Sequence, residues 1–289
     1  MLPAIKQGAF DVPTHGVSHD GAIWVFFTTD SYEVDGQMLM GRTVLGRSDD
    51  GGANYKYVGE LSRWKFINVS VHVGQIDQSA ADTGLDVGTP VLWIFGSGRY
   101  RMSDIYLAVM PLAGLSALSP ILFFKGDGWS RQEVDVAPLF CAGDVGELSV
   151  CWNGHFMRWL ALYNSGNPRG IVMHSAPKPW GPWSAQPVMI FDSGALADPL
   201  NPCSGNGYGR FMHIPWNVRV CDHVQDNMFP PYNLRDNDWG GEYGPYQIPR
   251  FASPLDGGGS RIWFVMSTWN PYETMLMSAD ITAAMIQAT

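Results

Sequence analysis

The sequence predicts an all-β fold, and within that class a five-bladed β-propeller. Four apolar segments of one form recur along the 289 residues, and each has a tryptophan among its first three residues: Ala22–Thr29, Val91–Ser97, Arg158–Asn164 and Arg261–Ser267. Such segments, rich in β-branched and aromatic residues and bounded by turn residues, are typical of buried strands. A β-sandwich is the competing fold, but it would show cleaner alternation and no long-period repeat, so we favour the propeller.

Each buried strand is the second member of a predicted set of four, which together make one propeller blade. Small-residue inner strands precede three of them, at Thr14–Ser18, Asn68–Val71 and Glu147–Val150. Third strands follow at Arg42–Ser48, Asp104–Val109, Gly170–Ser175 and Glu273–Ser278, and outer strands at Tyr55–Val58, Ile121–Phe124 and Pro187–Phe191. Four blades are therefore clear. The long gap before Arg261 leaves room for a fifth, irregular blade around Gly207–Pro215, within one domain over residues 1–289.

The turn residues agree with this fold. The 33 glycines and 20 prolines favour many tight turns over long helices. The segment Ser48–Tyr55 matches the pattern S-x-D-x-G-x-[TN]-[WY], which is that of the Asp-box hairpin of propeller hydrolases. Asp50 would accept backbone N–H groups of the turn there. We interpret this motif, and Pro179–Trp183 in the equivalent position of a later blade, as structural.

Composition excludes several classes of function. With 18 basic and 27 acidic residues the net charge is −9, so nucleic acid is not an expected partner. No window approaches the roughly 18–20 apolar residues of a membrane span. The first residues lack a secretory signal, so the cytoplasm is the default location for the sequence as given. The cysteines and histidines lack the spacing of a metal site, and we expect no metal, no cofactor and a monomer.

Propeller topology groups the polar loops on one face. The loops between second and third strands open there, together with the entries into the inner strands. The resulting set is polar with an aromatic rim, which suits a carbohydrate ligand, because sugar faces stack on aromatic rings and hydroxyls need planar polar partners. From this face we predict as sugar-contacting residues His15, Asn68, Arg99, Tyr100, Asn164, Trp269, Asn270 and Tyr272.

Glu147 is the sharpest catalytic candidate. It opens an inner strand whose other residues are small or apolar, so its carboxyl group should point into the central channel. Partial desolvation raises the pKa of a carboxyl group and suits it to general-acid chemistry. A glycosidase also needs a second carboxylate, about 5–5.5 Å or roughly 6.5–9.5 Å away. Asp30 and Asp198, with less weight Asp11 and Asp20, are the candidates.

Several segments resemble a bacterial family of domains of unknown function. They are Gly96–Ala108, Gly146–Val150, Tyr243–Tyr246 and Ser267–Tyr272, and the resemblance runs from about Asp11 to Asp280. Members of that family resemble five-bladed propellers, and some are endo-D-arabinanases. The resemblance implies a sugar cleft lined by Arg99, Glu147, Tyr243, Tyr246, Trp269, Asn270 and Tyr272. It also implies a further N-terminal blade with acidic residues, whereas this chain starts close to the segment that resembles Phe10–Thr14.

Two hypotheses of function follow. The first is a glycosidase, arabinanase-like, that cuts a polysaccharide such as D-arabinan by carboxylate chemistry, with Glu147 as acid and Asp30 or Asp198 as base or nucleophile. The second is a propeller that binds carbohydrate without cutting it, because the second carboxylate is not fixed by the sequence.

Overall fold

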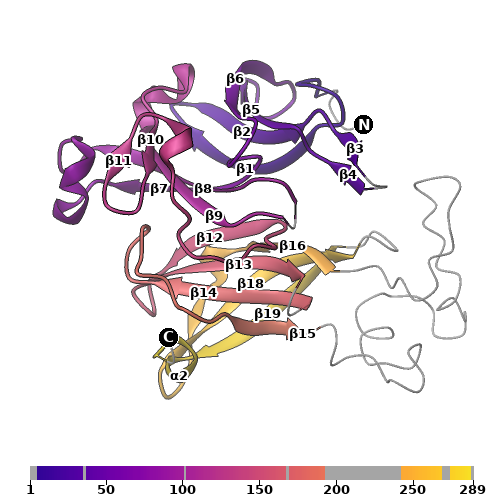
Figure 1. Ribbon diagram of the computed structural model, residues 1–289. Helices are drawn as coiled ribbons and strands as arrows, with labels where there is room; N and C mark the ends of the chain where they lie inside the picture. Colours follow the sequence, from indigo (N-terminus) through magenta and orange to yellow (C-terminus); the bar gives the residue numbers. More distant parts are fainter. Residues whose placement is uncertain are drawn as a thin grey trace, which may run out of the picture. The chain divides into compact units, whose positions relative to one another are not determined.

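The computed structural model describes residues 5–34, 37–100, 102–166, 169–192, 242–268 and 274–287. Nearly all elements in these ranges are β-strands, which form four main sheets of four or five strands and one small hairpin (Figure 1). The all-β prediction is therefore confirmed. The predicted fifth blade around Gly207–Pro215 lies outside the described residues.

The chain forms two compact units. The N-terminal unit comprises Met1–Cys151 and Ala176–Trp183, and the C-terminal unit comprises Trp152–Ser175 and Ser184–Thr289.

The first sheet belongs to the N-terminal unit and has the order β1-β2-β5-β6. Its strands are β1 (Val12–His19), β2 (Ala22–Thr29), β5 (Arg42–Ser48) and β6 (Lys56–Ser62). The observed β2 and β5 have the bounds that the sequence predicts. The long loop between them carries the small hairpin of β3 (Tyr32–Val34) and β4 (Gln37–Leu39).

The second sheet, also in the N-terminal unit, has the order β11-β10-β9-β8-β7. Its strands are β7 (Asn68–Gln75), β8 (Pro90–Ser97), β9 (Ile105–Pro111), β10 (Leu122–Phe124) and β11 (Trp129–Ser130). The short fifth strand, β11, was not predicted. Three 3₁₀ helices lie in the connections: η1 (Gln78–Thr83), η2 (Leu112–Ala117) and η3 (Glu133–Asp135).

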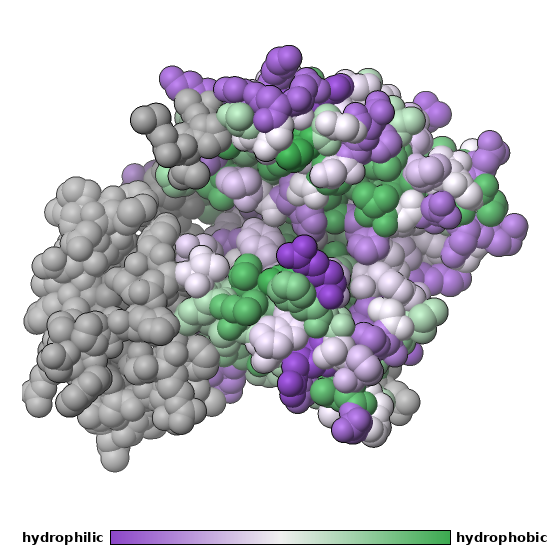
Figure 2. Space-filling view, turned by 180° about the vertical axis from the view of Figure 1, so that it is seen from behind, coloured by the Kyte–Doolittle hydropathy of each residue, from purple (hydrophilic) through white to green (hydrophobic). Residues whose placement is uncertain are grey.

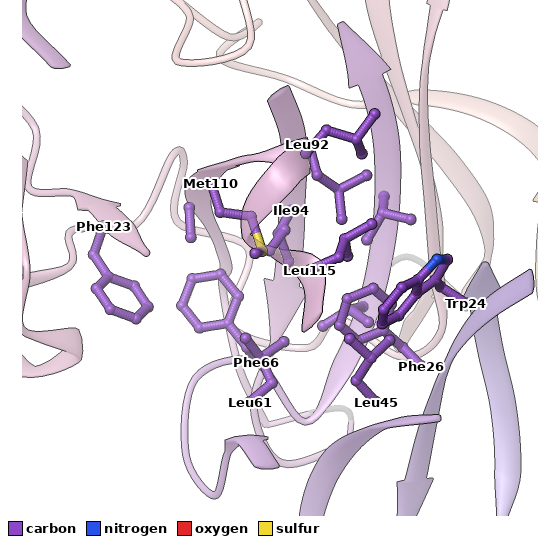
Figure 3. Close-up of a cluster of buried hydrophobic side chains, with 14 of the residues drawn as sticks. Trp24, Phe26, Leu45, Leu61, Phe66, Leu92, Ile94, Met110, Leu115 and Phe123 are labelled. Carbon is purple, nitrogen blue, oxygen red and sulfur yellow. The ribbon is translucent and has the colours of Figure 1, made fainter. Parts of the chain in front are cut away.

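The core of the N-terminal unit lies between these two sheets. Trp24 and Phe26 from β2 and Leu45 from β5 pack against Leu92 and Ile94 of β8 (Figure 3). Because β2 and β8 are covered on both sides, their residues are apolar on both faces, and this is the pattern by which the sequence reveals them. Burial of these side chains supplies the main driving force for joining the two sheets.

The third sheet has the order β12-β13-β14-β15. Its strands are β12 (Leu148–Asn153), β13 (Arg158–Gly166), β14 (Arg169–Ala176) and β15 (Val188–Asp192). In the C-terminal unit, Leu160 and Leu162 of β13 and Ile171 of β14 belong to a second buried cluster. All four predicted strands of this set are present, with their ends shifted by at most three residues.

The fourth sheet differs from the predicted set of four. Its strands are β16 (Glu242–Gln247), β17 (Ser253–Pro254), β18 (Gly259–Thr268) and β19 (Thr274–Thr282). Since β19 pairs along nearly all of β18, β16 and β17 share the other side of β18, separated by η5 (Pro249–Phe251). Residues 242–247 contain a glycine and a proline, which ordinarily disfavour a strand, so the sequence does not reveal β16. A short helix, α2 (Ala283–Gln287), follows β19.

The turn between β5 and β6 is held by Asp50. Its Oδ1 accepts hydrogen bonds from the Ser48 hydroxyl (2.7 Å) and the Asn54 N–H (2.9 Å), and its Oδ2 accepts one from the Asn54 amide (2.7 Å). These bonds, chiefly the one from the Asn54 side chain, lower the pKa of Asp50 to about 2. They favour the ionised form of Asp50 in the folded state only.

We therefore expect the Asp50→Ala change to lower Tm slightly at neutral pH without affecting any activity. The contribution is present above the ordinary carboxyl pKa and is lost as pH falls through about 2. The difference in Tm from wild type should therefore shrink as pH is lowered from 5 towards 2, by differential scanning calorimetry. Asp86→Ala, on another exposed turn, is the control. A difference that stays constant with pH would contradict this role.

Figure 2 shows hydrophilic side chains interspersed with hydrophobic ones over the face that it displays. No helix in the described part of the chain is long and apolar enough to cross a membrane.

Candidate functional site

In the first and second sheets, the inner strand begins beside the loop that joins the second and third strands. Val12 pairs with Thr28 and Arg42 with Thr29 in the first sheet. In the second sheet Asn68, the first residue of β7, pairs with Ser97, the last residue of β8. The predicted grouping of strand entries and loops is thus confirmed within these sheets. We call this margin of the N-terminal unit the entry edge; it carries Asp11, Asp30, Arg42, Asn68, Arg99, Tyr100 and Glu147.

Glu147 lies just before β12, on a segment held by the β8–β9 loop. Asp104 Oδ1 accepts hydrogen bonds from the N–H groups of Ala142 (2.8 Å) and Gly143 (2.9 Å). Nearer to Glu147, the Ser97 hydroxyl donates to the carbonyl of Gly146 (3.4 Å). These contacts place the segment of Glu147 beside the loop that carries Arg99 and Tyr100. Glu147 is half-buried, and its Oε2 atom is shielded from solvent.

Asp30 directly follows β2 in a left-handed backbone conformation, with φ of 56°. Its Oδ1 accepts the N–H of Ala9 (3.0 Å), and its Oδ2 accepts a short hydrogen bond from Nε of Arg42. The Ala9 hydrogen bond, and after it the Arg42 guanidinium, hold the pKa of Asp30 below its usual range although desolvation opposes them. Asp30 is therefore an ionised carboxylate and not a proton donor.

Arg42 contacts a second acidic residue, Glu60, in addition to Asp30, so that acidic and basic side chains alternate in a row. Its Nη1 lies 3.1 Å from Oε2 of Glu60, and Arg63 binds both oxygens of Glu60 at 2.8 Å. Bidentate pairs of this kind fix the planes of both groups, so the charges at this end of the entry edge have set orientations.

Asp11 occupies the place in the first sheet that Glu147 occupies before β12. Its Oδ1 accepts the Thr29 hydroxyl (2.7 Å) and its Oδ2 the Gln7 N–H (2.8 Å). From the sequence alone, Asp11 is a weaker candidate than Asp30. Asp11 nevertheless shares with Glu147 the signal of an acidic residue directly before an inner strand, and this signal would rank it higher.

Asn68 is buried and supports the adjoining loop. Its Nδ2 donates to the carbonyl of Gly98 (3.5 Å), next to Arg99. Arg99 itself is exposed and Tyr100 is half-buried, so both can reach a ligand at the entry edge.

His15 lies further along β1, where three inner strands meet. Its Nδ1 is 3.3 Å from the Ser70 hydroxyl of β7, and that oxygen accepts the N–H of Val150 in β12 (2.9 Å). The inner strands β1, β7 and β12 therefore lie side by side. Burial of the imidazole, and then the neighbouring His72, lower the pKa of His15 to about 4.

This low pKa predicts a pH-dependent stability. Between pH 6.5 and about 4 the unfolded state binds a proton at residue 15 that the folded state does not, so stability falls as pH decreases through this window. We expect His15→Asn, which can still bond to Ser70, to reduce the loss of unfolding free energy between pH 7.5 and 4.5 by about 2 kcal/mol. Urea unfolding at both pH values measures it. An unchanged pH dependence would show that His15 titrates normally in the folded chain.

The C-terminal unit carries three predicted contact residues. Asn164, near the end of β13, is fully buried and donates a short hydrogen bond to the carbonyl of Glu242. Its Oδ1 atom is buried and has no hydrogen-bond partner among the described residues. Tyr243 and Tyr246 are half-buried on β16. The remaining predicted site residues, Asp198, Trp269, Asn270 and Tyr272, lie outside the described residues.

In the described ranges, no three His, Cys, Asp or Glu side chains are grouped so that they could hold a metal ion. Cys141 and Cys151 are free thiols, and burial raises the pKa of the Cys151 thiol to about 12.

The model of one protein family, Domain of unknown function (DUF4185), matches residues 4–278, which is nearly the whole chain. The chain belongs to the DUF4185 family. This agrees with the resemblance seen in the sequence motifs, although it does not by itself assign an activity. No curated protein matches the chain.

Solved structures that are similar to this DUF4185 chain include carbohydrate-active enzymes. A candidate hydrolase from Bacteroides ovatus has a TM-score of 0.52 at 10% identity, over 91% of this chain and 55% of that one. A fructofuranosidase from Schwanniomyces occidentalis, complexed with fructose, has a TM-score of 0.50 at 8% identity, over 99% and 46%. An α-L-arabinanase from Cellvibrio cellulosa, complexed with arabinohexaose, has a TM-score of 0.45 at 9% identity, over 93% and 72%.

The DUF4185 chain spans about half the length of the first two of these proteins. At such low identity the likeness concerns the fold.

Proposed function

We propose that this chain is a glycoside hydrolase that acts on a polysaccharide through carboxylates at the entry edge. One observation carries the proposal: Glu147, half-buried with a shielded oxygen, the ionised carboxylate of Asp30 and the carboxyl group of Asp11 lie at strand entries or loops of the entry edge. Two carboxyl groups in contrasting environments are what glycoside hydrolysis requires.

In this proposal Glu147 protonates the leaving oxygen as general acid. Asp30, or Asp11 at the entry of β1, acts as nucleophile or as the base that activates water, and Asp198 remains a third candidate. Arg99, Tyr100 and Asn68 hold the sugar beside Glu147. His15, and in the C-terminal unit Asn164, Tyr243, Tyr246, Trp269, Asn270 and Tyr272, remain predicted contact residues. The proposal includes a five-bladed propeller with the described sheets as blades.

The substrate class is a furanose-containing polymer, with D-arabinan as the first candidate. Support comes from the motif resemblance and from the fold likeness to a fructofuranosidase complexed with fructose. The test is product release from D-arabinan, L-arabinan, inulin and β-1,3-galactan, analysed by chromatography. Oligosaccharides from one polymer would support the proposal and name the substrate. Intact polymers after prolonged incubation with folded protein would overturn it.

A second function, glycan binding without cleavage, is favoured by the state of Asp30. Its two oxygens are engaged by Ala9 and Arg42, and such engagement weakens a carboxylate as a nucleophile or base. Asp11→Asn and Asp30→Asn decide between the two. Loss of hydrolysis in either variant identifies the second carboxylate, whereas polymer binding with no product from wild type establishes the binding function.

A further inference from the structure

The turn that leads into β7 carries Trp64, and hydrogen bonds hold the backbone of this turn in place. The Ser62 hydroxyl oxygen accepts the N–H groups of Trp64 (2.9 Å) and Phe66 (3.2 Å), and the hydroxyl donates to Oε1 of Glu133 (2.6 Å). Glu133 belongs to η3, so the turn is fastened to a second element of the same unit. The backbone of residue 64 is therefore held from two sides.

The ring of Trp64 is held by a cation. The Lys65 ammonium lies 4.3 Å from the centre of the Trp64 ring and 5.2 Å from that of Tyr106, and it donates to the carbonyl of Val136 (2.9 Å). Desolvation lowers the pKa of Lys65, with the nearby Glu133 carboxylate opposing this shift. An ammonium group placed between two rings restrains both of them.

Despite this support, 52% of the Trp64 surface is exposed. A single exposed aromatic residue is common and would mean little alone. Trp64, however, borders the entry edge: its carbonyl oxygen lies so close to Gly98 that a Cβ atom there would approach it to 2.6 Å. The glycine lets the loop carrying Arg99 and Tyr100 lie directly against residue 64, and Asn68 donates to the same glycine.

Polar groups that precede Trp64 in the chain can bind the hydroxyls of a sugar. Arg63, the residue before Trp64, forms a bidentate pair with Glu60 that leaves hydrogen-bonding capacity for hydroxyl groups. A sugar residue has an apolar face, which stacks on an aromatic ring, and a rim of hydroxyls, which need polar partners of this kind.

We infer that Trp64 is a stacking platform for a neutral sugar residue of the glycan, adjacent to the residues around Glu147. This rests on the proposed function and adds to it a binding position that extends the entry edge past the reacting bond. Because ring and backbone are held before the ligand arrives, little conformational entropy is lost on binding. The platform therefore acts mainly on affinity for polymer and little on the chemical step.

Affinity electrophoresis in native gels containing D-arabinan, inulin or β-1,3-galactan tests the inference with the full chain. For the polymer that retards wild type, we expect Trp64→Ala to weaken the apparent affinity roughly tenfold, whereas Trp64→Tyr should keep most of it. Tyr57→Ala is the matched control, because Tyr57 is equally exposed, at 52%, on the outer strand β6. Thermal unfolding of each variant verifies that the fold is kept.

The outcomes separate the two proposals. Suppose that a polymer retards the wild-type chain or is cut by it. If the Trp64→Ala variant then behaves identically to wild type, the platform is overturned and the glycosidase proposal stands. Equal weakening by Tyr57→Ala also overturns it. If no polymer retards the wild-type chain and the wild-type chain cuts none of them, the proposed function fails, and the platform fails with it. For an active enzyme, the expected pattern is a raised KM with nearly unchanged kcat.

Discussion

Replacing Glu147 by glutamine should reduce hydrolysis of the responsive polymer about 10²–10⁴-fold, which is the usual contribution of a general acid. Glutamine has nearly the same shape, so the segment held by Asp104 and Ser97 should keep its position. What is lost is the proton that the leaving oxygen needs. Initial rates of reducing-sugar release, wild type beside variant, measure the effect.

The matched control is Asp86→Asn, the same carboxylate-to-amide change at an exposed loop residue ahead of β8, at the other end of that strand from the entry edge. Its rate should equal that of wild type. Retardation of the Glu147→Gln variant by the same polymer should persist, because binding does not need the proton. Full hydrolysis by Glu147→Gln would remove Glu147 from the reaction and leave its carboxyl group a structural role.

Replacing Phe66 by alanine should cost about 3–5 kcal/mol of unfolding free energy, as is typical for a fully buried aromatic residue. The ring lies in the core between the two sheets (Figure 3), 5.5 Å from the ring of Phe123 and 6.3 Å from that of Tyr106. It also fills the space left by Gly96, where a Cβ atom would come within 2.3 Å of the ring. Urea unfolding followed by circular dichroism measures the loss.

The same change should weaken glycan binding, because Phe66 joins the turn of Trp64 to the first residue of β7. Phe251→Ala is the control: this phenylalanine is 44% exposed, and its loss should change the unfolding free energy by no more than about 0.5 kcal/mol. A loss below about 1 kcal/mol for Phe66→Ala would contradict the packing described here.

The repeat in the sequence predicted most of the described strands. The buried strands are apolar on both faces because sheets or loops cover both sides, and that pattern is local and therefore readable. Strands that lack it were missed: β11 is only two residues long, and β16 contains Gly244 and Pro245. β11 forms a short hairpin with the preceding strand β10, and β16 pairs with β18 beyond an intervening 3₁₀ helix and the short strand β17. The apolar pattern that reveals the buried strands records neither pairing.

The candidate site divides in the same way. Topology alone predicted that strand entries and polar loops share one margin, and within the second sheet the pairing of Asn68 with Ser97 agrees with this. The choice among carboxylates depended on contacts between distant residues, such as the short bond from Arg42 to Asp30, which neither composition nor spacing reveals. The exposed, supported ring of Trp64 likewise became visible only with Lys65, Glu133 and Gly98 around it.

What the sequence by itself determined is the all-β class, the positions of the buried strands and the margin where polar loops gather, because each follows from local periodicity and chain order. What only the tertiary structure decided is the state of individual groups: Asp30 ionised and paired, Glu147 partly shielded, His15 neutral. Protonation and reach depend on burial and on partners tens of residues away, and these are fixed when the sheets pack.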